Sequence, residues 1–238
     1  MGPVDVLVFS PHPDDAEMGC GGTIAALIGE GRSVAVCYLT RGEMGTRGDA
    51  ETRAAETREA MKILGVGAYV YADIPDAHVF NDAHNRETVV RMIRQFQPRL
   101  ILAPYHLTLH PDHVQTTALV NDAAYLSGLL KIDTGQPRHR PARIMYYPLH
   151  PKFDPTLVVD ISSTFKQKMD AIRAYRSQFH DPSRPDMPQT LLSAQDFLDR
   201  LEAQARHFGS LIGRSYGEGF RTDLPLPVGE ARELLQIL

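Results

Sequence analysis

Residues 4–15 read VDVLVFSPHPDD, an apolar run that is followed at once by two prolines, a histidine and two aspartates. Residues 4–9 form a short run that is apolar apart from Asp5, as is typical of a buried strand in a parallel sheet. After a loop, residues 22–31 carry apolar side chains at helical spacing and end on a glycine. This part of the chain therefore predicts a strand, a loop and a helix in that order.

The same unit recurs along the chain. We predict further strands at 33–39, 68–72 and 100–103, and helices at about 50–64, 86–96 and 113–126. Parallel strands need long crossover connections, and a helix between successive strands supplies them. The predicted fold class is α/β, with a Rossmann-like, mostly parallel sheet and helices on both of its faces.

The pattern is less regular beyond residue 130. We expect strands at 144–147 and 157–161, helices at 165–175 and 190–207, and a loop or lid at the proline-containing stretch 181–189. A chain of 238 residues that is 43% hydrophobic can bury one substantial core. We therefore predict one domain over 1–238, with a Rossmann-like core at 1–130 and a C-terminal strand and helix extension at 131–238.

Composition excludes several classes of partner. The net charge is −4 and the basic residues are dispersed, which gives a phosphate backbone nothing to bind, so we expect no nucleic acid. No apolar run has the length of a membrane span, and the N-terminus turns polar before a signal-peptide core could form. Two cysteines, Cys20 and Cys37, fit a reducing compartment. We predict a cytoplasmic protein that does not bind membranes.

Two clusters of polar residues follow predicted strands. His12, Asp14 and Asp15 come after the first strand, and His110 and His113 come after the fourth. Ligands of open parallel sheets bind beyond the carboxyl ends of the strands, so we expect the two clusters to meet. Catalytic zinc sites use three protein ligands, often histidine and carboxylate, and leave one position for water. The residues His12, Asp15 and His113 meet that need.

Two further residues of the clusters are free for other tasks. Asp14 is adjacent to a ligand and can take a proton from water, and His110 lies three residues before His113, on the same side of a helix start. Iron(II) accepts the same ligand types as zinc, so either ion is possible. A protein that binds metal without catalysis remains an alternative, although such a site has no use for the spare carboxylate of Asp14.

Other catalytic motifs do not fit. The glycine run at 19–22 (GCGG) lacks the third glycine of a dinucleotide-binding loop, because Ile24 stands in its place. There is no G-x-S-x-G sequence and no P-loop lysine. We expect these glycines to let the backbone pass close to the metal loop and to start the helix.

The sequences PHPDD at 11–15 and HPDH at 110–113 together resemble the LmbE-like, PIG-L-type N-acetylglucosamine deacetylases. The ending at 207–220 looks most like the branch that deacetylates N-acetylglucosaminyl-malate in bacillithiol biosynthesis. The resemblance implies a zinc-dependent hydrolase with the metal on His12, Asp15 and His113. It also implies that Asp14 is the general base and that His110 assists the oxyanion. In the mechanism that we expect, His110 does so in its protonated form.

Substrate contacts follow from the same resemblance. We expect Asp112 to hold the imidazole of His110, and Arg53 to engage a malate carboxylate in bidentate fashion. Arg41 and Arg47 are weaker candidates for this contact. The implied partner is a small N-acetylated amino sugar, and the alternative substrate is a chito-oligosaccharide or another acylated amine. Relatives form homo-oligomers, so we expect one here, possibly a hexamer.

Overall fold

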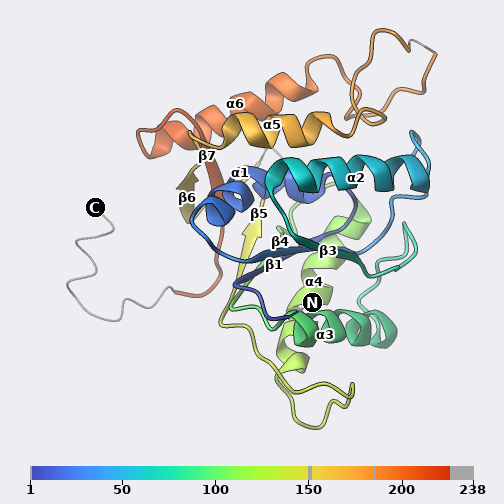
Figure 1. The fold of residues 1–238 in the computed structure, drawn as a ribbon, viewed down its shortest axis with the longest axis vertical. Helices are drawn as coiled ribbons and strands as arrows, with labels where there is room; N and C mark the ends of the chain where they lie inside the picture. The colour runs from blue at the N-terminus through green and yellow to red at the C-terminus, as the bar shows by residue number, and fades with distance from the viewer. Residues whose placement is uncertain (1, 150–151, 185, 226–238) are drawn as a thin grey trace.

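The computed structural model describes residues 2–149, 152–184 and 186–225. Its centre is a five-stranded sheet in the order β3-β2-β1-β4-β5, in which every neighbouring pair is parallel (Figure 1). This confirms the predicted α/β, Rossmann-like class. The strands are β1 (Val6–Ser10), β2 (Val34–Tyr38), β3 (Ala68–Tyr71), β4 (Leu100–Pro104) and β5 (Arg143–Tyr147).

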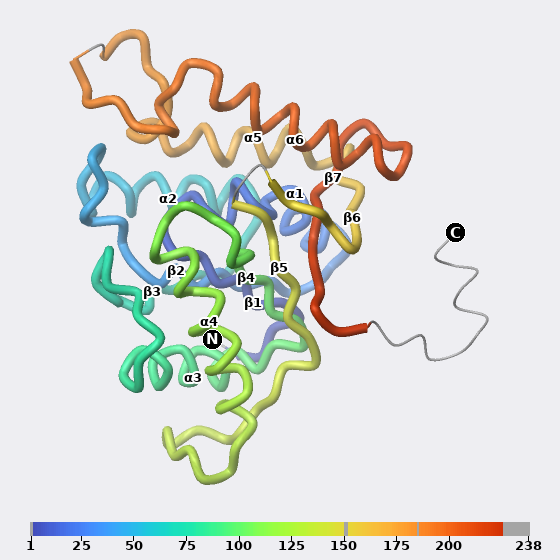
Figure 2. Tube along the Cα trace, turned by 180° about the vertical axis from the view of Figure 1, so that it is seen from behind, coloured from blue at the N-terminus to red at the C-terminus, as the bar shows by residue number. Residues whose placement is uncertain are grey.

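Helices cover both faces of the sheet, which is why β1 and β2 are buried along their whole length. Helices α1 (Asp15–Gly29) and α2 (Ala50–Leu64) lie on one face and α3 (Ala83–Phe96) and α4 (Pro111–Ser127) on the other (Figures 1 and 2). Each face has its own cluster of buried apolar side chains. Among the described residues, we find no helix that is both long and apolar enough to cross a bilayer.

The chain after β5 forms an outer layer, whereas β5 completes the central sheet, so the core extends beyond the boundary at residue 130 that the sequence predicted. Helices α5 (Phe165–Arg173) and α6 (Phe197–Leu211) lie over α1 and α2, and β6 (Leu157–Asp160) pairs antiparallel with β7 (Gly217–Phe220) (Figures 1 and 2). The sequence does not predict β7, because GEGF has neither alternation nor branched residues. Helix α6 starts at Phe197, later than predicted, and the described residues between 181 and 189 are not helical, as expected.

The glycine run corrects our prediction for α1. The helix begins at Asp15 rather than at Gly22, so the glycines lie inside it, around a kink at Cys20 (φ −147°, ψ 19°). A side chain at Gly19 would overlap the ring of the fully buried Tyr147. A side chain at Gly22 would come within 2.8 Å of Ile161. The glycines therefore allow α1 to pack closely on the sheet and on the outer layer.

The kink leaves the second half of α1 with a free N-terminus inside the protein. Glu218 of β7 satisfies it, because its carboxylate accepts hydrogen bonds from the backbone N–H groups of Gly22 (2.9 Å) and Thr23 (2.7 Å). Lys168 of α5 pairs with the same carboxylate at 2.6 Å, and both charged side chains are buried. Glu218 thus caps the second half of α1, and Lys168 balances the charge of Glu218. The first turn of the same helix carries Asp15 of the polar cluster.

We predict that Gly19→Ala destabilises the protein by about 1–3 kcal/mol, because the added methyl group overpacks the core against Tyr147. Gly29→Ala is the control, since Gly29 is exposed on the same helix and has no atom within 4 Å of an added Cβ. That variant should be neutral, or more stable by at most about 1 kcal/mol. Urea denaturation measures both values. Equal free energies of unfolding for the two variants would contradict the packing account.

Candidate metal centre

The two polar clusters meet at the carboxyl ends of β1 and β4, which are neighbours in the sheet. His12 follows β1, Asp15 begins α1, and His113 lies in the first turn of α4. Residues 12 and 113 are thus brought together across 101 positions of sequence. The predicted meeting of the two clusters is what the structure shows.

The three predicted ligands point donor atoms at one another. His12 Nδ1 lies 3.1 Å from Asp15 Oδ2 and 3.2 Å from His113 Nε2, and His113 Nε2 lies 3.1 Å from the same Asp15 oxygen. Ligand atoms of a tetrahedral zinc ion are roughly 3.3 Å apart. The triangle of donors therefore fits one face of such a site, and it is composed of the nitrogen and oxygen ligands that zinc and iron(II) accept.

The outward-facing nitrogens of both histidines have partners. His12 Nε2 lies 3.1 Å from Asp76 Oδ1 and 3.2 Å from Asp112 Oδ2. His113 Nδ1 lies 3.3 Å from Thr108 Oγ1. Metal-ligating histidines usually make such a bond through the nitrogen that does not face the metal, because it sets the tautomer and the ring orientation.

Sequence reasoning missed Asp76 and Thr108. The available signal for Asp76 was its place after β3, at the same edge of the sheet as the two clusters. Thr108 offered a weaker signal, since it precedes the second cluster but belongs to no metal-binding motif.

The charges of the cluster shift its pKa values in opposite directions. Burial disfavours a charged His12 ring, but hydrogen bonds from the ring to Asp112, Asp15 and Asp76 outweigh it and raise the pKa of His12 well above its usual 6.5. Burial also disfavours a charged Asp15, yet the charge of His113 and the bonds to both histidines hold the pKa of Asp15 well below its usual value. The donor set is therefore strongly polarised.

Asp14 lies beside this triangle, not in it. Its backbone has φ 103°, a left-handed conformation that costs a non-glycine residue of the order of 1 kcal/mol. Its Oδ2 accepts a hydrogen bond from Arg53 Nη2 at 2.9 Å, and the same Nη2 bonds to the carbonyl of Pro13. Burial raises the pKa of Asp14 above its usual value, although the charge of Arg53 opposes this effect. A buried carboxylate of raised basicity is suited to accept a proton.

His110 caps α4 and faces solvent. Its Nδ1 accepts a hydrogen bond from the backbone N–H of Asp112 at 3.2 Å, so a neutral ring carries its hydrogen on Nε2. Burial and the neighbouring charges of His12 and His113 lower the pKa of His110. The mechanism expected from the sequence has a protonated ring, whereas these surroundings favour a neutral one that donates through Nε2–H. Its ring centroid lies 4.7 Å from that of His12 and 4.9 Å from that of His113.

The carboxylate of Asp112 does not hold His110, which corrects the expectation from the sequence. It faces His12 Nε2 and accepts hydrogen bonds from the backbone N–H groups of Ala77 (2.9 Å) and Val79 (3.4 Å). His110 is the N-cap residue of α4, and it is the backbone N–H of Asp112, not the carboxylate, that bonds to its ring.

The three arginines differ in exposure. Arg53 is 5% exposed and lies beneath Asp14. Arg47 is also buried, and its Nη1 donates to the carbonyl oxygens of Gln178 and Phe179. Arg41 is exposed and pairs with Asp73 at 2.7 Å. The weaker candidates Arg41 and Arg47 therefore have partners away from the donor triangle, and Arg53 touches the residue beside it.

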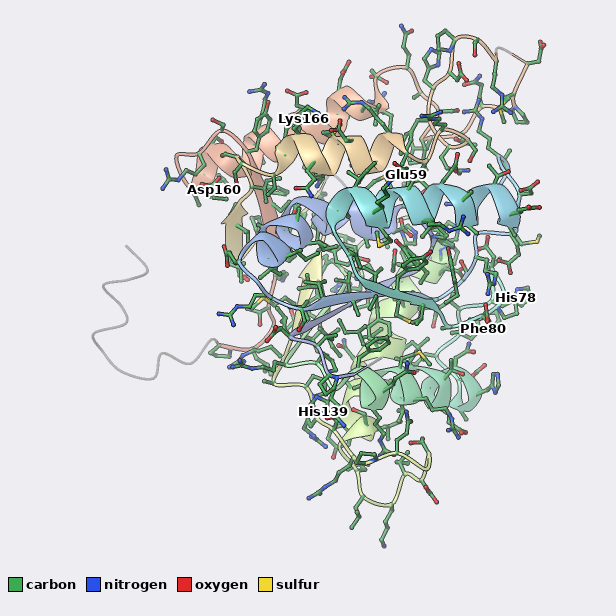
Figure 3. All side chains as sticks on the ribbon, viewed as in Figure 1. Glu59, His78, Phe80, His139, Asp160 and Lys166 are labelled. Carbon is green, nitrogen blue, oxygen red and sulfur yellow. The ribbon has the colours of Figure 1, made fainter. Side chains whose placement is uncertain are left out.

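Histidines outside the clusters lie in different places. Figure 3 shows His78 and Phe80 at the edge of the sheet where β3 ends, and His139 on the lower side near α4. His78 Nδ1 contacts the carbonyl oxygen of Asp76 at 2.9 Å, whereas His139 Nε2 contacts that of Pro98 at 2.7 Å, before β4. Of these two histidines, only His78 is near the metal-ligand cluster.

The chain is similar in sequence and in structure to known deacetylases and to further solved proteins. Residues 7–124, which include both clusters, match the family model described as PIG-L: GlcNAc-PI de-N-acetylase. The chain is 30% identical over 232 residues to the diacetylchitobiose deacetylase of Thermococcus kodakarensis, covering 91% of this chain and 82% of that protein.

Two other similarities are informative. The chain is 27% identical over 192 residues to a probable N-acetyl-α-D-glucosaminyl L-malate deacetylase 2 of Bacillus cereus, covering 73% of this chain and 83% of that protein. The crystal structure of the conserved protein TT1542 from Thermus thermophilus superposes with a TM-score of 0.87 at 34% identity, covering 96% of this chain and 98% of that one.

We predict that zinc binding at pH 7 releases at least one proton. The raised pKa of His12 means that its ring is protonated in the zinc-free protein, and zinc binds only the neutral ring. Affinity should therefore rise with pH until the pH passes the pKa of zinc-free His12. Titration calorimetry in two non-chelating buffers of different ionisation enthalpy measures the number of protons. Identical heats in both buffers would show that His12 is already neutral.

Proposed function

Because the chain belongs to the PIG-L family of de-N-acetylases, we propose that it is a zinc-dependent hydrolase that removes the acetyl group from an N-acetylglucosamine conjugate. The observation that carries the proposal is the triangle of His12, Asp15 and His113 donor atoms with a buried carboxylate, that of Asp14, directly beside it. A metal site with a neighbouring proton acceptor is what amide hydrolysis requires.

His12, Asp15 and His113 would hold the ion. When bound, a zinc ion would polarise the acetyl carbonyl and lower the pKa of water, so that water can lose a proton and attack the amide at neutral pH. Side chains of the protein carry out the proton transfers and stabilise the oxyanion.

Asp14 accepts the proton of the attacking water on its carboxylate and returns it to the amine nitrogen as the C–N bond breaks. Arg53 Nη2 holds this carboxylate in place through its hydrogen bond to Oδ2. His110 donates Nε2–H to the carbonyl oxygen as it becomes negative, because its Nδ1 is already occupied by the backbone of Asp112. The products are acetate and a free amine.

N-acetylglucosaminyl-malate is our first candidate substrate. The support is the resemblance of the 207–220 ending to that branch and the similarity to the Bacillus cereus protein. Diacetylchitobiose is the second candidate, because the Thermococcus relative matches more of the chain at higher identity. A cytoplasmic location and a homo-oligomeric assembly stay predictions from the sequence.

Primary-amine release should be assayed from N-acetylglucosaminyl-malate, free N-acetylglucosamine and diacetylchitobiose, before chelation, after chelation and after zinc is restored. We expect release that depends on zinc and is fastest with the malate conjugate. Faster release from diacetylchitobiose would identify the second candidate as the preferred substrate. The absence of release from all three with zinc bound would refute the proposed function.

Asp14→Asn is the matched variant for this assay. The amide keeps the volume and a hydrogen-bond acceptor for Arg53 but cannot take a proton, so turnover should fall at least about a hundredfold while zinc stays bound. Glu59→Gln is the control. It removes a carboxylate on α2 whose side chain is 56% exposed (Figure 3), and it should leave turnover unchanged. Full turnover by the Asp14→Asn variant would remove Asp14 from the mechanism.

Arg53 has two possible roles that a further variant separates. Its guanidinium is engaged with Asp14 and Pro13 and nearly buried, so bidentate binding of a malate carboxylate would require this pair to open. If Arg53 orients Asp14, Arg53→Lys should lower kcat on every substrate by a similar factor, because a lysine cannot reproduce the planar contact. A rise in KM confined to the malate conjugate would instead support the substrate contact that the sequence predicted.

A further inference from the structure

Asp76 is a buried carboxylate that neither the sequence motifs nor the proposed mechanism uses. It lies in the loop after β3 and is 6% exposed. Its Oδ1 is 3.1 Å from His12 Nε2, and the Oδ2 of Asp112 is 3.2 Å from the same nitrogen. One imidazole nitrogen therefore faces two carboxylates from two separate segments.

This arrangement decides which nitrogen of His12 is free. A nitrogen that faces two carboxylate oxygens must carry a hydrogen, because a lone pair there would be repelled by both. In the neutral ring, Nδ1 is then the bare nitrogen. Nδ1 is the atom that lies 3.1 Å from Asp15 and 3.2 Å from His113. The tautomer required of a metal ligand is thus selected by the protein itself.

Asp76 also ties a second loop to this ring. Its Oδ2 accepts a hydrogen bond from the backbone N–H of Met44 at 3.0 Å, and its own backbone N–H donates to Glu43 Oε1 at 2.7 Å. The two bonds run in opposite directions between the loop after β2 and the loop after β3. They fasten residues 43 and 44 to the residue that holds His12.

The fastened loop packs on the other half of the site. A side chain at Gly42 would come within 2.5 Å of Arg53 Nη1, and one at Gly45 within 3.2 Å, so the loop backbone lies directly against the guanidinium. Arg53 in turn holds Asp14. Oδ1 of Asp76 therefore contacts the metal ligand His12. Its Oδ2 holds the loop that packs against Arg53, the partner of the proposed base Asp14.

We propose that Asp76 is a positioning residue that sets the His12 tautomer for metal binding and fastens the 42–45 loop against the Arg53–Asp14 pair. The inference rests on the proposed zinc site. Asp112 shares the first task but not the second, since its carboxylate bonds to the backbone of residues 77 and 79 and not to the loop after β2.

A cation site made by His12 Nε2, Asp76 and Asp112 is the competing interpretation, because these donors lie within 4.8 Å of one another. The backbone N–H of Ala77 argues against it. This group donates to Asp76 Oδ1 at 2.8 Å and to Asp112 Oδ2 at 2.9 Å, which places a hydrogen among the oxygens that would have to bind the ion.

The test measures zinc itself, without substrate. The zinc dissociation constant and stoichiometry of Asp76→Asn and Asp76→Ala are obtained by competition with a chromophoric chelator. Nitrogen-15 NMR of the zinc-free proteins, above the pH at which His12 loses its charge, reports the His12 tautomer. Asp73→Asn is the control, because Asp73 lies in the same loop but is 62% exposed and pairs with the exposed Arg41.

We expect one zinc per chain in all proteins and a dissociation constant raised about ten- to a hundredfold in both Asp76 variants. The His12 ring should shift from a single Nε2–H form towards a mixture of tautomers, which a merely structural role would not cause. The Asp73 variant should match the wild type. The isosteric Asp76→Asn variant keeps the test valid if the Asp76→Ala variant does not fold.

Unchanged affinity and an unchanged tautomer in the Asp76→Asn variant would overturn the inference. So would a wild-type stoichiometry of two zinc ions that falls to one in the variants, since that result would identify the cluster as a cation site. In both cases the wild type still binds zinc, so the proposed function stands. A wild type that binds no zinc would overturn the proposed function and this inference together.

Discussion

The site depends on one buried imidazole ring, that of His12, whose two nitrogens both face carboxylates. Asp15 lies at Nδ1, and Asp76 and Asp112 lie at Nε2. With Asp14, four buried carboxylates surround this ring. Buried like charges are costly unless cations balance them, and within the chain a protonated His12 and the guanidinium of Arg53 beside Asp14 supply positive charge. A divalent cation held by His12, Asp15 and His113 would add to that balance.

Holding such a cluster together requires support from every layer of the fold. The parallel order of β1 and β4 brings the two motifs to one edge, and α1 must then start at once from Asp15. The outer layer stabilises α1 from behind through Glu218 and Lys168 at its kink. The phenol of Tyr175, after α5, bonds at 2.6 Å to Glu17 in the first turn of the same helix. These C-terminal residues thus support the helix that carries Asp15.

The sequence predicted those features that local pattern determines. Apolar runs marked the five central strands, and the two motifs marked the ligands because parallel strands share a carboxyl edge. It failed where long-range packing decides. The glycines of α1 resemble a loop in sequence, and only the packing of Tyr147 and Ile161 against them explains their place in a helix. Strand β7 has no strand pattern because its glycines fit beneath α6. Asp76 is one of several aspartates in the loop after β3 and belongs to no motif, and only the fold shows that it faces His12.

The two groups proposed to move and donate protons differ in access, which restricts how a substrate can bind. Asp14 is 3% exposed and pairs with the buried Arg53, whereas His110 is exposed at the start of α4. In the proposed mechanism, a substrate that engages both groups would present its carbonyl oxygen to Nε2–H of His110 and its amide nitrogen to Asp14. Since the neutral His110 ring carries no charge, it could stabilise the developing oxyanion of the proposed reaction without repelling an ion held by His12, Asp15 and His113. Burial and the charges of His12 and His113 lower the pKa of His110, although the carboxylates of Asp112 and Asp15 oppose this effect, and a neutral ring suits the role of an uncharged donor beside a cation.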